Sequence, residues 1–247
     1  MITQTAFSSW INCIQPNPQA ELRLFCFPYA GGSAMAYRRW SNFLPKTVEV
    51  CPVELPGRGK QIKLSPYNRI EPLVEALATN LRPYLNKPFA FFGHSMGGLI
   101  SFELSRFLRS EFNLHPIHLF ISARQAPQIN WRRKHIHNLP EAQFMDELRR
   151  LDGTPQEVLN NQELMEFFSP IIRADFSVLE TYVYIPQAPF DFPITAFGGM
   201  QDTEVSADDL DGWKEHTNLF SLQMIEGNHF YVNSAPEILL QTITQKL

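Results

Sequence analysis

Short apolar runs recur along the chain, and most of them contain too few polar positions to be half-exposed strands. The run Leu22–Phe27 is apolar except for Arg23, and Phe89–Phe92 is apolar throughout. Continuous apolar runs of this length are typical of strands that are buried on both faces of a parallel sheet. The remaining predicted strands are Val48–Val53, His118–Ala123, Phe192–Gly198 and Leu219–Ile225.

Between these runs, apolar residues recur at the three- and four-residue spacing of amphipathic helices. The helical patterns cover Tyr37–Leu44, Ile70–Leu85, Leu99–Leu108 and Asn233–Leu247. Alternating strands and helices predict an α/β fold, with a mostly parallel sheet that helices cover on both faces. The length suits a single domain spanning residues 1–247.

One stretch, residues 125–188, interrupts this alternation because it contains no convincing strand. Pro140 occupies the first turn of a predicted helix, and two further helical patterns follow, one around Phe168 and one around Leu179. Two ordinary crossover helices are the alternative, but this stretch is long for a single crossover. We therefore expect a helical lid inserted in the domain, which would exclude water and shape access to a site.

Composition excludes several classes of function. The chain carries 21 Lys and Arg against 25 Asp and Glu, and its one basic cluster is Arg132–Lys134, so we expect no nucleic-acid partner. No apolar stretch reaches the ~18 residues of a membrane helix, and residues 1–22 do not resemble a secretory signal. Cys13, Cys26 and Cys51 are predicted to be free thiols in a reducing cytoplasm, the last two buried in the core.

The pentapeptide Gly93–Gly97 lies between a predicted strand and a predicted helix, and reads Gly-His-Ser-Met-Gly. This is the sequence form of a nucleophile elbow, a sharp turn that lifts the hydroxyl of Ser95 out of the sheet. Glycines permit the strained turn and the close passage of neighbouring segments. An ordinary glycine-rich turn could share this sequence, so the interpretation depends on an acid and a base that follow in order.

Asp202 and His229 stand where such a site needs its acid and its base. An α/β-hydrolase site supplies Ser, then Asp or Glu, then His, each in a loop after a strand. His229 follows the last predicted strand, and Asp202 follows the strand before it. The alternatives are a solvent-facing loop histidine, a turn or N-cap aspartate, and the competing carboxylates of Asp208, Asp209 and Asp211.

Two backbone amides are expected to bind the oxyanion that acyl transfer creates. One is the N–H of Met96, directly after the nucleophile, and the other is the N–H of Ala30 in the glycine loop Pro28–Ser33. A glycine loop that merely turns the chain is the alternative for the second donor. Four parts in the expected order on the expected elements favour a serine hydrolase.

Six segments together resemble the type II thioesterases. These are stand-alone editing enzymes of nonribosomal peptide and polyketide assembly lines, related to medium-chain fatty-acyl thioesterases. Tyr29, Thr203 and Asn228 depart from residues frequent in that family, and none of them is a predicted catalytic side chain. The segments are Phe27–Gly32, Glu54–Arg58, Gly93–Gly98, Ser122–Pro127, Arg173–Phe176 and Gly227–Phe230.

The resemblance implies a serine thioesterase of the α/β-hydrolase fold. Its substrate would be an acyl group held on the phosphopantetheine arm of an acyl or peptidyl carrier protein. We expect no metal and no other cofactor, and we expect a monomer because nothing in the sequence demands a dimer. The predicted lining of the acyl site is Tyr29, Phe144, Met145, Phe167, Phe168 and Phe230.

Three functions remain open at this point. The first is hydrolytic editing of misacylated carrier proteins. The second is a medium-chain fatty-acyl thioesterase or a small-molecule esterase. The third is a catalytically silent binding protein of the same fold, against which the full set of candidate triad residues argues.

Overall fold

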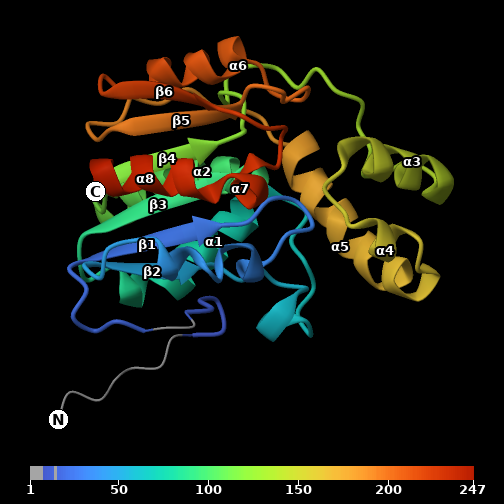
Figure 1. The fold of residues 1–247 in the computed structure, drawn as a ribbon, viewed down its shortest axis with the longest axis horizontal. Helices are drawn as coiled ribbons and strands as arrows, with labels where there is room; N and C mark the ends of the chain where they lie inside the picture. Colours follow the sequence, from blue (N-terminus) through green and yellow to red (C-terminus); the bar gives the residue numbers. More distant parts are fainter. Residues whose placement is uncertain (1–7, 14–15) are drawn as a thin grey trace.

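A six-stranded sheet forms the centre of the computed structural model, which describes residues 8–13 and 16–247 (Figure 1). Neighbouring strands pair in parallel in the order β2-β1-β3-β4-β5-β6, which confirms the predicted fold class. The strands are β1 (Leu22–Phe27), β2 (Val48–Pro52), β3 (Phe89–His94), β4 (His118–Ser122), β5 (Ile194–Gly199) and β6 (Phe220–Ile225).

Helices connect the strands and cover the sheet. The α-helices are α1 (Ile70–Leu81), α2 (Met96–Phe112), α3 (Glu141–Leu151), α4 (Gln156–Leu159), α5 (Gln162–Glu180), α6 (Ala207–Asp211), α7 (Tyr231–Ser234) and α8 (Pro236–Lys246). The 3₁₀ helices are η1 (Ala34–Tyr37), η2 (Trp40–Asn42), η3 (Gly59–Gln61), η4 (Arg82–Tyr84) and η5 (Gly212–His216). None of the helices within the described residues is long and apolar enough to cross a bilayer.

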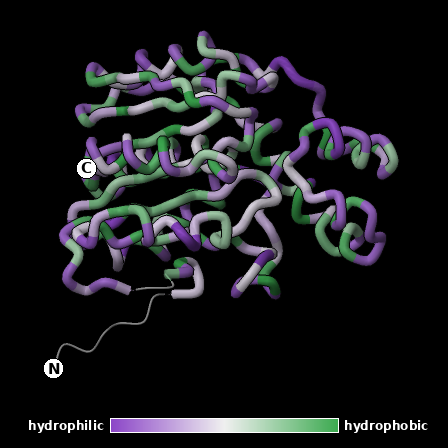
Figure 2. The backbone as a smooth tube through the Cα atoms, viewed as in Figure 1, coloured by the Kyte–Doolittle hydropathy of each residue, from purple (hydrophilic) through white to green (hydrophobic). Residues whose placement is uncertain are grey.

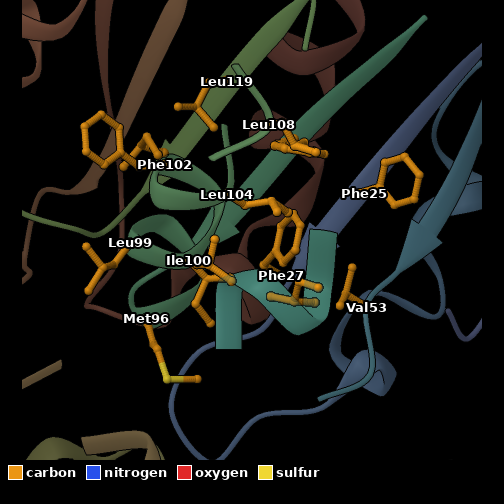
Figure 3. Close-up of a cluster of buried hydrophobic side chains, with 14 of the residues drawn as sticks. Phe25, Phe27, Val53, Met96, Leu99, Ile100, Phe102, Leu104, Leu108 and Leu119 are labelled. Atoms are coloured by element: carbon orange, nitrogen blue, oxygen red, sulfur yellow. The ribbon is translucent and has the colours of Figure 1, made fainter. Parts of the chain in front are cut away.

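Alternate residues of the strands pack into two separate cores, one on each face of the sheet. Phe25 and Phe27 of β1 join the core beneath α1 and α2 (Figure 3), whereas Leu24 and Cys26 join the core beneath η1, η2, α7 and α8. This alternation explains why the strand sequences are apolar throughout. Figure 2 shows the same distribution, with hydrophobic stretches in the central strands and a hydrophilic segment leading into α3.

The cysteines follow the sequence prediction within these cores. Cys26 and Cys51 are free thiols without solvent exposure, and burial raises the pKa of both thiols well above the usual range. They therefore remain protonated and act as small apolar residues.

Four predicted helical patterns differ in extent from the structure. The pattern Tyr37–Leu44 forms only η1 and η2, and the C-terminal pattern is divided at Pro236, whose missing N–H suits the first turn of α8. The two patterns around Phe168 and Leu179 are one helix, α5, with Pro170 inside it. One buried face runs along α5 on both sides of this proline, and tertiary packing of that face outweighs the one lost backbone hydrogen bond.

Residues 125–188, which we call the helical insertion, carry α3, α4 and α5 beyond the carboxyl ends of the strands (Figure 1). The described structure of this segment contains no strand, as the sequence predicted. The insertion has a small hydrophobic core of its own, separate from the two cores of the sheet. Its buried members are Ile136, Phe144, Leu148, Leu159, Met165 and Ile172.

Helix α2 approaches the ends of β1 and β3 so closely that two glycines have no room for a side chain. A Cβ atom at Gly97 would lie 2.1 Å from the carbonyl oxygen of Phe27, and one at Gly93 would lie 2.0 Å from the carbonyl oxygen of Gly97. Both contacts are with backbone, which cannot swing aside as a flexible side chain would. The flanking glycines of the pentapeptide therefore allow helix and strands to meet at this point.

We expect Gly97→Ala to lower the free energy of unfolding by about 3 kcal/mol, because the added methyl group forces α2 away from β1. Urea unfolding followed by circular dichroism measures the change. Ser110→Ala, at an exposed position near the end of α2, is the control and should change the free energy by less than about 0.5 kcal/mol. A Gly97→Ala variant as stable as this control would contradict the close approach.

Candidate active site

Ser95 forms the turn between β3 and α2 with a backbone conformation that L-residues rarely adopt. Its φ is 52° and its ψ is −112°, and the helix begins at the next residue, Met96. The Ser95 amide donates a hydrogen bond of 2.7 Å to the carbonyl oxygen of Ser122, at the end of neighbouring strand β4. Strain of this kind persists only where the surroundings hold it, and it is common at functional sites. The geometry is that of the predicted nucleophile elbow.

Asp202 and His229 come together although 26 residues separate them in sequence order. His229 Nδ1 lies 2.8 Å from Asp202 Oδ2, and the Asp202 side chain is fully buried. The other carboxylate oxygen, Oδ1, accepts the amide N–H groups of Glu204 at 2.7 Å and Val205 at 3.2 Å. Because a carboxylate accepts hydrogen bonds, Nδ1 is assigned as the protonated nitrogen, which leaves Nε2 of the imidazole as an acceptor.

Hydrogen bonds between the loops after β5 and β6 hold this pair in place. The amide of Gln201 donates to the carbonyl oxygen of Gly227 at 2.9 Å, and the amide of Gly227 donates to Gln201 Oε1 at 2.6 Å. A Cβ atom at Gly199 would lie 2.6 Å from the carbonyl oxygens of Gly227 and Asn228, so the end of β5 and the loop after β6 come too close for a side chain at this position. The carboxyl ends of two parallel strands thus deliver the acid and the base to one place.

Ser95 and His229 line one cavity at the carboxyl edge of the sheet, together with Tyr29, Ala30 and Phe230. Within the described parts of the chain, no hydrogen bond links the Ser95 hydroxyl to His229. Catalytic hydrogen bonds are often long before substrate binds and tighten in the complex. The structure therefore brings the three predicted residues to one site and joins two of them directly.

Two amides have the properties expected of oxyanion donors. Residues 8–13 and 16–247 provide no hydrogen-bond acceptor for the N–H of Ala30 or for the N–H of Met96. A turn closed by a 2.9 Å bond from the Gly32 amide to the Tyr29 carbonyl carries Ala30 at the cavity, and Gly31 takes a φ of +75° within it. Met96 begins α2, where the first amides point out of the helix and favour negative charge.

Four predicted lining residues lie outside this cavity, which differs from the sequence expectation. Phe144 is fully buried in the insertion's own core, and Phe168 packs against that core. Met145 lines a separate groove on the insertion, and the Phe167 side chain is 48% exposed. Their helical spacing indicated the apolar face correctly, but periodicity does not say which surface that face packs against.

Sequence reasoning missed the residues that form the apolar wall of the cavity. They belong to the helical insertion. All but Trp131, which lies in the segment before α3, fall on the predicted helical patterns, so the sequence marked them as apolar but gave no way to choose among the apolar positions. They are Trp131, Leu148, Leu151, Ile172, Phe176 and Leu179.

A buried polar chain behind the site was also missed. His94 Nδ1 lies 2.9 Å from the hydroxyl of Ser122, which lies 2.5 Å from the hydroxyl of Tyr231. The His94 ring is 5.5 Å from the ring of His229, between centroids, and is fully buried. Burial, and secondarily the nearby His229, lowers the pKa of His94 well below its usual range. A neutral imidazole therefore packs against the candidate base and adds no positive charge beside it.

One group of side chains could in principle hold a cation, and it lies apart from the cavity. Within the described residues, His135, His137 and Glu180 place one ligand atom each within 4.8 Å of one another. The Glu180 carboxylate already accepts the amides of Ile136 at 2.7 Å and His137 at 3.2 Å, and contacts the His137 ring. These bonds fasten the start of the insertion to the end of α5, so the cluster has a structural explanation.

Comparison with known proteins agrees with this geometry. A family model described as a thioesterase domain matches residues 22–247. The gramicidin S biosynthesis protein GrsT of Aneurinibacillus migulanus is 45% identical over 241 residues, which cover 97% of this chain and 94% of GrsT. The medium-chain S-acyl fatty acid synthase thioesterase of Homo sapiens is 34% identical over 90% of this chain and 84% of that protein.

Solved structures extend the comparison to three dimensions. The type II thioesterase BorB from the borrelidin biosynthetic cluster matches with a TM-score of 0.89 at 35% identity, over 98% of this chain and 99% of BorB. The family match covers nearly the whole chain, and it agrees with the fold and with the site described above. The chain belongs to the thioesterase family, and is a thioester hydrolase of the α/β-hydrolase fold.

Proposed function

We propose that this protein hydrolyses acyl groups from the phosphopantetheine arm of carrier proteins, and so frees misacylated carriers in nonribosomal peptide or polyketide synthesis. The observation that carries the proposal is the bond between His229 and Asp202 at the cavity that Ser95 lines. Similarity to GrsT, to BorB and to YbtT, a type II thioesterase from the yersiniabactin NRPS/PKS biosynthetic pathway, supports the substrate class.

In the proposed mechanism, His229 Nε2 takes the proton from the Ser95 hydroxyl as its oxygen attacks the thioester carbonyl carbon. The carbonyl oxygen becomes an oxyanion bound by the N–H groups of Ala30 and Met96. When the tetrahedral intermediate collapses, the carbon–sulfur bond breaks and the thiolate leaves with the proton from His229.

The second half of the reaction regenerates the enzyme. A water molecule gives a proton to His229 Nε2 and attacks the acyl-serine carbonyl, and the carboxylic acid is released as Ser95 recovers its proton. Asp202 keeps the imidazole in one tautomer through its bond to Nδ1, and stabilises the imidazolium that forms in both halves. Ser95 and His229 are thus the two side chains that change protonation in this scheme.

We further propose that the helical insertion acts as a lid. Its residues supply the apolar wall of a narrow cavity of about 50 Å³, which Ser95 and His229 also line. Such a space suits a short acyl chain and the end of a slender arm. The wall excludes water until the acyl-serine has formed.

The competing enzymatic function is a medium-chain fatty-acyl thioesterase, because the human enzyme of that name is 34% identical. The two proposals share one mechanism and differ in the acyl group and its carrier. We favour carrier editing. We also propose that the protein acts as a monomer in the cytoplasm, where the buried thiols of Cys26 and Cys51 would stay reduced.

Ser95→Ala should lower the rate of acyl release from an acyl carrier protein by about 10⁴-fold or more, because no other group can form the acyl-enzyme. Mass spectrometry of the carrier measures release. A serine-directed fluorophosphonate should label the unmodified protein once and leave the variant unlabelled. Ser110→Ala is the matched control and should retain full activity. Release by the Ser95→Ala variant at the unmodified rate would exclude the proposed nucleophile.

Asp202→Asn should lower kcat by about 10⁴-fold with little change in KM, because the amide no longer fixes the tautomer of His229. Stopped-flow or steady-state hydrolysis of an acyl thioester measures the loss. Asp208→Asn, an exposed carboxylate six residues further along, is the control. A loss of activity in the control and not in Asp202→Asn would place the acid at the other carboxylate.

The substrate class can be tested by kcat/KM for one acyl group presented on a carrier protein, on coenzyme A and on a simple ester. We expect the carrier-bound thioester to be preferred at least about tenfold, and two- to four-carbon acyl groups to be preferred over twelve-carbon groups, because of the size of the cavity. A preference for twelve-carbon groups would favour the fatty-acyl thioesterase instead.

A further inference from the structure

The buried carboxylate of Asp175 reaches from the helical insertion to the loop that carries a candidate oxyanion donor. Asp175 lies on α5, is 3% exposed, and its Oδ2 accepts the amide N–H of Gly31 at 2.8 Å. We call residues Pro28–Ser33 the oxyanion loop. This bond spans 144 positions of sequence and joins the insertion to the end of β1.

Arg58 completes a three-way junction at the same point. Its Nη1 donates to Asp175 Oδ2 at 2.8 Å, and its Nη2 donates to Asp175 Oδ1 at 2.7 Å. Nη1 also donates to the carbonyl oxygen of Gly32 at 2.8 Å. The guanidinium therefore binds both the carboxylate and the oxyanion loop, and both charged side chains are almost fully buried.

Helix α5 also touches the oxyanion loop through an apolar contact. A Cβ atom at Gly31 would lie 3.3 Å from Cγ1 of Ile172, which is one turn before Asp175 on α5 and lines the cavity. Desolvation makes a buried ion pair a weak source of net stability, so its value lies in the geometry that it fixes. Here all four hydrogen bonds of the junction fix the positions of α5, Arg58 and the oxyanion loop relative to one another.

The junction and the turn already engage two amides of the oxyanion loop. The Gly32 amide closes the turn onto Tyr29, and the Gly31 amide is withdrawn toward Asp175. The Ala30 amide has no acceptor within the described residues, and Ala30 lines the cavity. We propose that Asp175, held by Arg58, is a positioning residue that sets the Ala30 amide for the oxyanion, so that the seating of α5 and the assembly of the oxyanion hole are one event.

This inference rests on the proposed function, because it assigns a role within the same acyl transfer. It predicts that lifting α5 from the sheet removes the anchor of the oxyanion loop. The site would then bind an acyl group without stabilising its transition state. Acyl transfer would be restricted to the state in which the insertion is seated on the oxyanion loop.

The test compares Asp175→Asn with the unmodified protein in two reactions. Asparagine keeps the shape and an oxygen that accepts from Gly31 and from Arg58 Nη1, but its NH2 group cannot accept the bond from Arg58 Nη2, and the negative charge is lost. Hydrolysis of an acyl thioester should lose about 10²-fold in kcat, the cost of a misplaced catalytic group, with KM changed less than about threefold. In a Ser95→Cys background, alkylation by iodoacetamide forms no oxyanion, and its rate should change less than about twofold.

Arg58→Lys provides a second variant in case Asp175→Asn does not fold. Lysine keeps the charge but cannot form the two parallel bonds and reach Gly32 as well, so kcat should again fall while the alkylation rate is retained. The control is Glu49→Gln, which breaks the Arg23–Glu49 pair, a comparably buried ion pair of 2.7 Å between β1 and β2. It should leave kcat unchanged even if it lowers the melting temperature.

The outcomes separate this inference from the proposed function. If the unmodified protein hydrolyses no acyl thioester, the proposed function fails. If the unmodified protein is active and the folded Asp175→Asn and Arg58→Lys variants match its kcat, only the positioning role fails. Equal losses in hydrolysis and alkylation would also overturn it, since they would indicate a general collapse of the site. A loss confined to kcat supports it.

Discussion

The contact of bare backbone between helix α2 and the ends of β1 and β3 is the constraint on which the site depends. Gly93 and Gly97 allow that contact, and it forces Ser95 into a conformation that exposes its side chain at the edge of the sheet. Parallel pairing then makes every strand end at this same edge. The loops that follow β1, β5 and β6 meet at this edge because of the topology. A few local hydrogen bonds then fix the positions of Ala30, Asp202 and His229.

Much of this arrangement could be predicted from the sequence because its signals are local. Apolar runs mark the strands, and the glycines around Ser95 mark the elbow. Asp202 and His229 could be chosen from many candidates because chain order in a parallel sheet implies position in space. Their direct contact needed coordinates, since loop backbone bonds between residues 200–201 and 225–227 determine how far each loop reaches.

The lining of the cavity and the Asp175 junction could not be predicted in the same way. Phe144 and Leu148 share one apolar helix face, yet only Leu148 lines the cavity, while Phe144 lies wholly within the insertion's core. The helical periodicity of apolar residues indicates that a helix face is buried, but not which surface that face packs against. In the sequence, Asp175 stood out only as part of a segment that resembles the family. Its bond to Gly31 depends on how α5 packs over the sheet, which no local sequence pattern predicts.

The insertion's separate core has an evolutionary consequence. Leu148 and Ile172 belong to that core and also line the cavity, so exchanges among such residues reshape the cavity while the packing under the sheet is untouched. The cavity wall and the catalytic residues thus lie on different parts of the fold. Acyl-group selectivity can therefore change while the catalytic residues stay the same. Sequence change is constrained at the Asp175 junction, because the proposed positioning role requires the carboxylate to stay within reach of the oxyanion loop.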